Sequence, residues 1–297
     1  MDFIKGLLSG TLFRNALPLL TMISAFLLFS REYASYFALL RRKFSSLIVP
    51  LVVWNLPVAA AIYVVQRYTA LELEFSETLH PATLTAWIDA LLAVSSEPAN
   101  FPLYFLRDLF VLALLTPVFA MFYRLAPYAG LLAVFLIAVY GLDGPLLFRT
   151  DMLIYYYLGG FLASKRLDVR VLDPYASIGL ALLIFASISL VLLDITPHPH
   201  LRALLAPALV WPAIGLLANT RLGDFCLRHS DASFVIFVTH GAVLMLLWAI
   251  YGTAFTALPY AVFYVAAPLA CIAFGIAVNA TAKRHLPSVR KLLLGGR

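Results

Sequence analysis

A few ionisable side chains lie inside stretches that are otherwise apolar, and these residues have the chemistry that catalysis needs. Arg107 and Asp108 lie in segment 104–109 (YFLRDL), and His240 ends segment 233–240 (SFVIFVTH). A guanidinium can bind an anion or stabilise a developing oxyanion, and an imidazole can take a proton from a hydroxyl. The candidate catalytic residues are therefore His240, Arg107 and Asp108.

Each of these candidates also has a structural interpretation. Neighbouring residues on a helix do not face each other, so Arg107 and Asp108 are expected to neutralise one another poorly and to face partners on other helices. Such an ion-pair network can be purely structural. A single histidine on an apolar helix is more often an interhelical hydrogen-bond partner than a base, so His240 carries both interpretations.

A second set of polar residues are candidates for substrate binding. Arg14, in segment 13–18 (FRNALP), is predicted near the outer end of the first span, where it either binds substrate or extends to the lipid headgroups. Asp151 begins an apolar segment with Tyr155 one turn later, and it is either a site residue or a helix cap. The set is completed by Tyr104, on the same helix face as the central charges, and by the basic run Arg41, Arg42 and Lys43.

The composition indicates a membrane protein. Of the 297 residues, 63% are hydrophobic and 12% are charged, whereas soluble domains have roughly 45–50% and about 25%. No polar stretch is long enough for a separate domain, so we expect one membrane domain over residues 1–297. The net charge of +6 comes from short clusters between apolar runs, which argues against a nucleic-acid partner. Cys226 and Cys271 have neither paired nor metal-ligand spacing.

The fold class predicted is all-α, a polytopic transmembrane helical bundle. A helix needs roughly 20 apolar residues to cross the hydrocarbon core. On this basis we predict about nine spans, at residues 10–30, 44–66, 103–123, 126–142, 151–164, 174–194, 201–219, 232–251 and 259–281.

The charges between the spans predict the orientation. Most Lys and Arg residues fall in one set of alternate connections and in the tail. The other set has few basic residues and holds Glu72, Glu74, Glu77, Asp89, Glu97, Asp143 and Asp194. The positive-inside rule then places the N-terminus outside and the C-terminus in the cytoplasm. The longest connection, about 67–102, is predicted to be external, with a short interfacial helix over 82–94.

Five segments, taken in order, resemble landmarks of the acyltransferase 3 family, integral-membrane O-acyltransferases of bacterial surface glycans. They are 17–28 (LPLLTMISAFLL), 47–54 (LIVPLVVW), 102–109 (PLYFLRDL), 157–161 (YLGGF) and 233–240 (SFVIFVTH). The resemblance covers nearly the whole chain. Two departures are that the family's first helix, which carries an Arg and a His, is expected to be missing here, and that Arg41, Arg42 and Lys43 match the family's paired-arginine motif only loosely.

The resemblance implies an inner-membrane enzyme that moves an acyl group, most often acetyl, from acyl-CoA to a hydroxyl of a glycan or of its lipid-linked precursor. It implies no bound cofactor, with acyl-CoA as co-substrate. In this interpretation His240 is the base, Arg107 and Arg14 position the acyl donor or the acceptor, and Asp108 orients an arginine. The basic run at Arg41 would attract the coenzyme A phosphates.

Two alternatives remain open. One is a catalytically inactive relative that binds glycan or a partner enzyme, since the His-bearing helix is expected to be missing. The other is a transporter or flippase of a lipid-linked sugar, although the sequence contains no convincing internal repeat of the kind that transporters have.

Overall fold

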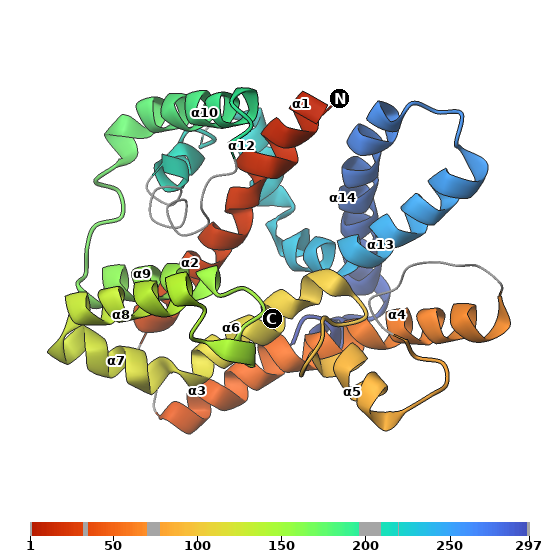
Figure 1. The fold of residues 1–297 in the computed structure, drawn as a ribbon, viewed down its shortest axis with the longest axis horizontal. Helices are drawn as coiled ribbons and strands as arrows, with labels where there is room; N and C mark the ends of the chain where they lie inside the picture. Colours follow the sequence, from red (N-terminus) through yellow and green to blue (C-terminus); the bar gives the residue numbers. More distant parts are fainter. Residues whose placement is uncertain (1, 32–34, 70–77, 196–208, 219, 296–297) are drawn as a thin grey trace. The chain divides into compact units, whose positions relative to one another are not determined.

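The chain is helical throughout the part that the structure describes. The computed structural model describes residues 2–31, 35–69, 78–195, 209–218 and 220–295, and within these ranges it contains helices and connecting turns and no strand (Figure 1). The all-α prediction is therefore confirmed. The chain divides into two compact units: unit 1 comprises residues 1–36 and 111–225, and unit 2 comprises residues 37–110 and 226–297.

Unit 1 begins with a continuous helical run and continues with four later helices. The run consists of α1 (Asp2–Lys5), the π-helical turn η1 (Gly6–Leu12), the 3-10 turn η2 (Phe13–Asn15) and α2 (Ala16–Phe29); the later helices are α7 (Thr116–Leu125), α8 (Pro127–Tyr140), α9 (Asp151–Ser164) and α10 (Ala176–Leu192). Helix α12 (Arg221–Arg228) lies at the boundary between the units.

Unit 2 combines two separate stretches of sequence. The first contributes α3 (Tyr36–Lys43), η3 (Phe44–Ile48), α4 (Val49–Tyr68), α5 (Leu84–Leu92), η4 (Phe101–Leu103) and most of α6 (Tyr104–Leu114); the second contributes η7 (Ser230–Ala232), α13 (Ser233–Ala254), α14 (Tyr260–His285) and α15 (Pro287–Leu293).

Within the described ranges, five helical segments are long and apolar enough to cross a membrane. They are Asp2–Phe29, Tyr36–Tyr68, Asp173–Leu192, Ser230–Ala254 and Tyr260–His285. The pair Phe101–Leu114 and Thr116–Leu125, broken at Leu115, makes a sixth if it is one span. These apolar helices are those of a multi-pass membrane protein, but the predicted count of about nine spans is not confirmed.

The difference in count has physical reasons. Helices α8 and α9 coincide with the predicted spans at 126–142 and 151–164, but each has 14 residues, which is about 21 Å of helix against a hydrocarbon core of about 30 Å. Much of the predicted span at 201–219 lies outside the described residues. The first helical run begins at Asp2 rather than at residue 10, because Phe3, Ile4, Leu7 and Leu8 continue the apolar pattern.

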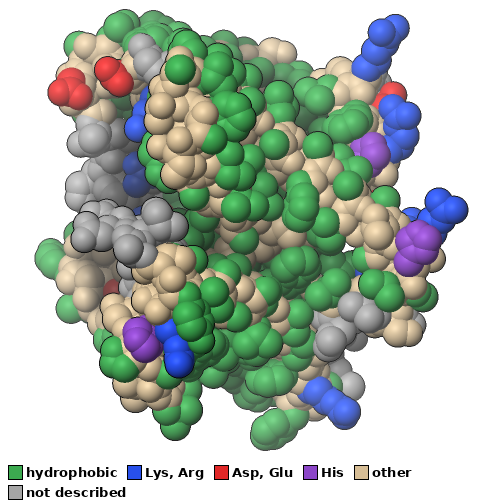
Figure 2. Space-filling model, turned by 90° about the vertical axis from the view of Figure 1, so that its right-hand side faces the viewer, with side chains coloured by type: hydrophobic (Ala, Val, Ile, Leu, Met, Phe, Trp, Pro, Cys, Tyr) green, Lys and Arg blue, Asp and Glu red, His purple; other side chains and the backbone are tan. Residues whose placement is uncertain are grey.

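Large apolar side chains cover much of the surface of these helices. Phe185 on α10 is 71% exposed and Leu269 on α14 is 61% exposed, whereas a soluble helix would turn such residues inward. On the face drawn in Figure 2, hydrophobic side chains cover most of the area, and the few Lys and Arg side chains lie near its margins. This surface suits a lipid surrounding.

In unit 1, helices α2 and α9 pack closely because two glycines remove the side chains between them. A Cβ built on Gly159 would lie 2.1 Å from the carbonyl oxygen of Met22 on α2. One built on Gly160 would lie 2.7 Å from Phe29 Cδ2 on α2 and 2.3 Å from the hydroxyl oxygen of Tyr123 on α7. The Tyr123 hydroxyl donates to the Tyr157 carbonyl at 3.0 Å. Gly159 and Gly160 therefore permit α9 to pack closely against its neighbours.

In unit 2, α13 and α14 form a hairpin (Figure 1, in blue), and α15 returns to pack against α4. The Trp54 indole donates to the Leu293 carbonyl at 3.0 Å. Arg290 on α15 donates to the Asn279 side chain at 3.2 Å and lies 3.6 Å from the Asp231 carboxylate. The C-terminal helix therefore ties three helical segments of unit 2 together.

Helix α5 lies within the range 82–94 for which a short helix was predicted; its place at the membrane interface stays a prediction. Thr83 caps its start by accepting from the Ala86 N–H at 3.3 Å, and its end turns at Ala93 (φ 54°). Burial acts to raise the pKa of Asp89, but hydrogen bonds from the side chain and backbone of Ser95 outweigh it, so this pKa lies below its ordinary value.

The α2–α9 contact yields a test of the packing. We expect Gly159→Ala to lower the free energy of unfolding by roughly 1–3 kcal/mol, because the added methyl overlaps a backbone carbonyl that cannot move without separating the helices. Thermal unfolding of the purified protein in detergent, followed by tryptophan fluorescence, measures this change.

The control is the same substitution where space is available. A Cβ on Gly252 in α13 would meet nothing within 4 Å, so Gly252→Ala should leave stability unchanged or raise it by up to about 1 kcal/mol through helix propensity. Equal midpoints for the two variants would contradict the close α2–α9 contact.

Candidate functional site

Arg107 and Asp108 form an ion pair with each other in α6, which corrects the expectation that they would neutralise one another poorly. Arg107 Nη1 lies 3.0 Å from Asp108 Oδ1, and Nη2 lies 3.5 Å from the Val94 carbonyl oxygen. The Arg107 side chain is 13% exposed and that of Asp108 is 0% exposed. The facing rule holds for Cβ directions, whereas the long arginine side chain can bend back to the adjacent carboxylate.

The buried Asp108 carboxylate constrains this pair. A buried charge is tolerated when it is paired and hydrogen-bonded, and Arg107 supplies both the charge and the donor. Because the Arg107 side chain keeps some exposure while Asp108 has none, the guanidinium is the member of the pair that a ligand can reach. The arrangement holds a cation in a fixed orientation.

His240 contacts its own helix, and not the interhelical partner that the structural interpretation predicted. Its Nδ1 lies 2.5 Å from the Phe237 carbonyl oxygen. A carbonyl only accepts hydrogen bonds, so Nδ1 carries the proton and Nε2 of the neutral ring carries the lone pair. Among the described residues Nε2 has no hydrogen-bond partner. This is the tautomer that a proton acceptor needs.

The His240 ring lines a pocket of about 330 Å³ between α13 and α14. The other lining residues are mainly apolar, with Ser233 at one end and Cys271 opposite. The Cys271 thiol lies 3.8 Å from the His240 carbonyl oxygen, and the Phe237 ring lies 5.7 Å from that of Phe105 on α6. The imidazole therefore has mainly apolar neighbours.

A pair of buried asparagines supports this part of unit 2. The Asn55 side chain on α4 accepts from the Asn100 backbone N–H at 2.8 Å and donates to the Leu91 carbonyl at 3.1 Å. The Asn100 side chain donates to the Val238 carbonyl at 2.8 Å. Both residues are at most 1% exposed. Together they connect α4, the end of α5 and α13, two residues before His240.

The sequence indicated only half of this network. Asn55 stands out as an amide inside an apolar span, whereas Asn100 precedes Phe101 and Pro102 at the edge of a predicted external connection. The signal that could have found it is Gly241: a Cβ there would lie 2.4 Å from Asn100 Oδ1. A glycine beside a candidate histidine indicates that another polar group approaches the helix closely.

The remaining candidates are divided between the two units. Arg41, Arg42 and Lys43 end α3 in unit 2, where Arg41 and Arg42 are exposed. Tyr104, also in unit 2, is 7% exposed, and its ring lies 5.5 Å from that of Phe101. Unit 2 therefore holds His240, Arg107, Asp108, Tyr104 and the basic run.

Unit 1 holds Arg14 and Asp151. The structure places Arg14 in η2, midway along the run Asp2–Phe29 and not near its end, because helix formation begins eight residues earlier than predicted. Its side chain is exposed. Asp151 is the first residue of α9 and half-buried, where its negative charge favours the helix N-terminus. The role of each as a site residue stays a prediction.

In the part of the chain that the structure describes, no three His, Cys, Asp or Glu side chains group as metal ligands would. Unit 2 carries a tethered guanidinium and a buried carboxylate on α6 and an imidazole with a free lone pair on α13. This combination can hold an anion or an oxyanion and can take a proton.

The asparagine network yields a stability prediction. Asn55→Leu should lower the free energy of unfolding by about 2 kcal/mol or more, because it leaves a buried N–H and a carbonyl without their partner. Asn15→Leu is the matched control: Asn15 is also buried, but its amide donates only to Thr11 and Leu12 of its own helical run. Equal unfolding midpoints in detergent would show that the network contributes little.

Comparison with known proteins gives a consistent result. An acyltransferase domain family matches residues 2–278. The succinoglycan biosynthesis protein ExoH of Rhizobium meliloti (strain 1021) is 30% identical over 311 aligned residues, which cover 100% of this chain and 83% of that protein. No solved structure matches. The family resemblance derived from the five sequence landmarks is thus confirmed, and this chain belongs to the family of membrane acyltransferases.

Proposed function

We propose that this protein transfers an acyl group, in the simplest case acetyl, from acyl-CoA to a hydroxyl of an exported polysaccharide or of its lipid-linked precursor. The observation that supports this most strongly is the family match across residues 2–278. A polysaccharide acceptor is supported by the similarity to ExoH, a succinoglycan biosynthesis protein. The position is the inner membrane, with the N-terminus outside and the C-terminus inside.

The reaction exchanges a thioester for an oxygen ester. The sugar hydroxyl oxygen attacks the thioester carbonyl carbon, the carbon–oxygen bond forms, and the carbon–sulfur bond to coenzyme A breaks. The hydroxyl proton leaves to a base and finally protonates the departing thiolate. The enzyme therefore needs a proton acceptor and a group that stabilises negative charge on the carbonyl oxygen.

His240 is the proton acceptor in this proposal. Its Nδ1 is fixed as a donor by the Phe237 carbonyl, so Nε2 presents the lone pair. The apolar lining of its pocket disfavours water as a competing acceptor of the acyl group. General base catalysis of this kind contributes roughly 10²–10⁴-fold to a rate.

Arg107 is the cation that orients the acyl donor or stabilises the oxyanion, and Asp108 positions it. The carboxylate holds Nη1 and the Val94 carbonyl lies near Nη2, so little motion is needed when negative charge develops. Tyr104, one turn before Asp108, contributes to substrate binding in the same segment. Asp151 contributes to substrate binding from unit 1.

The exposed Arg41 and Arg42, with Lys43, attract the phosphates of coenzyme A at the inner face. Phosphate groups bind to clusters of basic side chains through charge-assisted hydrogen bonds. The protein binds no resident cofactor in this proposal, because acyl-CoA is consumed as a substrate. Arg14 in unit 1 completes the substrate-binding residues.

The role of His240 can be tested with one substitution. His240→Asn retains an amide donor that can reach the Phe237 carbonyl, but it lacks the basic nitrogen. We expect label transfer from acetyl-CoA to polysaccharide, in membranes that contain the protein, to fall by roughly a hundredfold or more.

His285→Asn is the matched control, since His285 is the exposed last residue of α14. It should transfer label at the rate of the unmodified protein. Unchanged transfer by His240→Asn would remove His240 as the base. Absence of transfer by the unmodified protein, over a series of acyl-CoA donors, would overturn the proposed function itself.

The role of Arg107 can be tested with a substitution that preserves the positive charge. Arg107→Lys keeps a cation beside the buried Asp108 but loses the planar fork of donors. We expect folded protein with transfer reduced tenfold or more, measured together with the unfolding midpoint. Arg290→Lys, which alters another arginine–aspartate pair of unit 2, should retain transfer. Full activity of Arg107→Lys would show that Arg107 serves only as the structural counter-ion of Asp108.

A further inference from the structure

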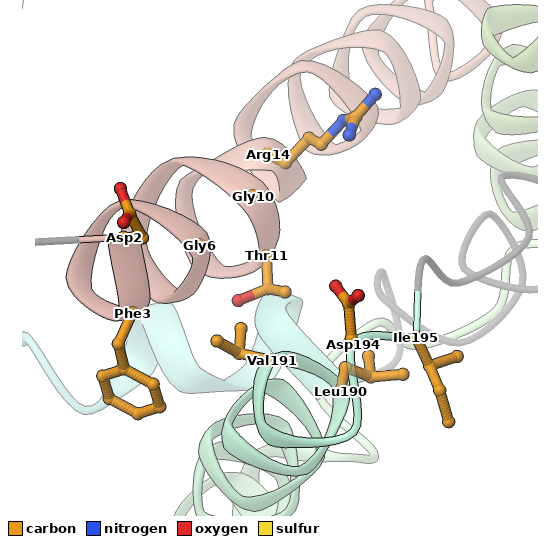
Figure 3. A pocket seen from close by; sticks show the side chains of 10 residues that line it. All are labelled: Asp2, Phe3, Gly6, Gly10, Thr11, Arg14, Leu190, Val191, Asp194 and Ile195. Carbon is orange, nitrogen blue, oxygen red and sulfur yellow. The ribbon is translucent and has the colours of Figure 1, made fainter.

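Unit 1 contains a pocket lined by polar and apolar residues, of which the proposed function uses only Arg14. It has a volume of about 420 Å³ and lies between the first helical run and the end of α10. In Figure 3, Thr11 and Asp194 extend into the space between these two segments, whereas the Arg14 side chain, on the turn beyond Thr11, extends away from Asp194 in this view. Asp2 and Phe3 line the opposite end of the pocket. This volume falls in the range of small-molecule sites, about 300–1,000 Å³.

The charged groups of this pocket do not neutralise one another. Arg14 and Asp194 both line it, yet among the described residues no ion pair or hydrogen bond of either side chain is formed. Arg14 lies midway along an apolar helical run of 28 residues, where an uncompensated charge is costly and is a functional candidate. With Asp2, the described lining carries two carboxylates and one guanidinium.

The pocket is open because glycines form part of its wall. A Cβ built on Gly10 would meet nothing within 4 Å, whereas one on Gly6 would lie 3.3 Å from Val191. Phe3, which is 43% exposed, adds an aromatic ring to the lining. The wall therefore combines an apolar ring, hydrogen-bond acceptors and a cationic donor around an open space.

This combination selects among ligand classes. A sugar ring carries hydroxyls that both donate and accept, so carboxylates and a guanidinium can all bind it, and its apolar face can pack on an aromatic ring. The phosphates of coenzyme A would be repelled by the two carboxylates, and only one guanidinium would attract them. An acyl chain would leave the charges without partners. A neutral sugar residue fits the lining best.

We propose that this pocket binds one neutral sugar residue of the acceptor glycan, with Asp194 accepting from its hydroxyls and Arg14 donating to its oxygens. The inference rests on the proposed function, because it assigns the acceptor subsite of that reaction. The sequence leaves open whether Arg14 positions the acyl donor or the acceptor. This proposal assigns Arg14 to the acceptor. Asp194 acts in binding and takes no part in proton transfer.

The test measures binding and kinetics with full-length protein in detergent. Asp194→Asn retains the size of the side chain and removes the charge. We expect it to weaken binding of de-acylated succinoglycan oligosaccharides, measured by equilibrium dialysis, roughly tenfold, because a hydrogen bond to a charged group is lost. The KM for the oligosaccharide should rise by the same factor while the KM for acetyl-CoA stays unchanged. Arg14→Ala should act in the same direction.

Asp173→Asn is the matched control, since Asp173 is an exposed residue just before α10, at its opposite end. It should alter neither constant. Active Asp194→Asn protein with unchanged oligosaccharide binding would overturn the pocket proposal and leave the acyltransferase proposal standing, and so would a change confined to the KM for acetyl-CoA. If the unmodified protein transfers no acyl group, the acyltransferase proposal fails, and the dialysis experiment alone still decides whether the pocket binds sugar.

Discussion

In an apolar surrounding each backbone N–H and carbonyl must find its partner within the protein, and in unit 2 two asparagines meet this requirement. Where α5 ends and the chain turns toward α6, helical hydrogen bonds cannot serve the backbone. The Asn55 side chain forms hydrogen bonds with Leu91 before that connection and with Asn100 after it. The Asn100 side chain donates to the carbonyl of Val238 on α13. The chain that leads into α6, which carries Arg107, and α13, which carries His240, are thereby joined through buried amides.

The helices of this chain could be predicted well from sequence, because long apolar runs leave little choice of structure in lipid. The helices at α2, α4, α10, α13 and α14 were all expected. The span count was not confirmed because hydropathy does not measure helix length: α8 and α9 are apolar but short. The beginning of the first run was also predicted late, which placed Arg14 near the end of a helix when it lies midway along one.

The contacts of the site residues could not be predicted, because they depend on side-chain reach and on residues distant in sequence. Arg107 pairs with its own neighbour, contrary to the facing rule, and His240 bonds a carbonyl of its own helix. The sequence places Asp194 only among the acidic residues that predict the orientation, and nothing in it joins Asp194 to Arg14, more than 170 residues earlier. A single sequence shows which chemical groups these residues carry, but it does not show which residues they contact in the folded protein.

The pairing of Arg107 with Asp108 has a consequence for how the protein is made. Unit 2 is assembled from residues 37–110 and 226–297, so α6 leaves the ribosome more than a hundred residues before α13 exists. A lone carboxylate in that helix would enter the bilayer at a cost of roughly 3 kcal/mol with nothing to offset it. Because its counter-ion is the preceding residue, Asp108 has a partner for its charge within α6 itself, before α13 is synthesised.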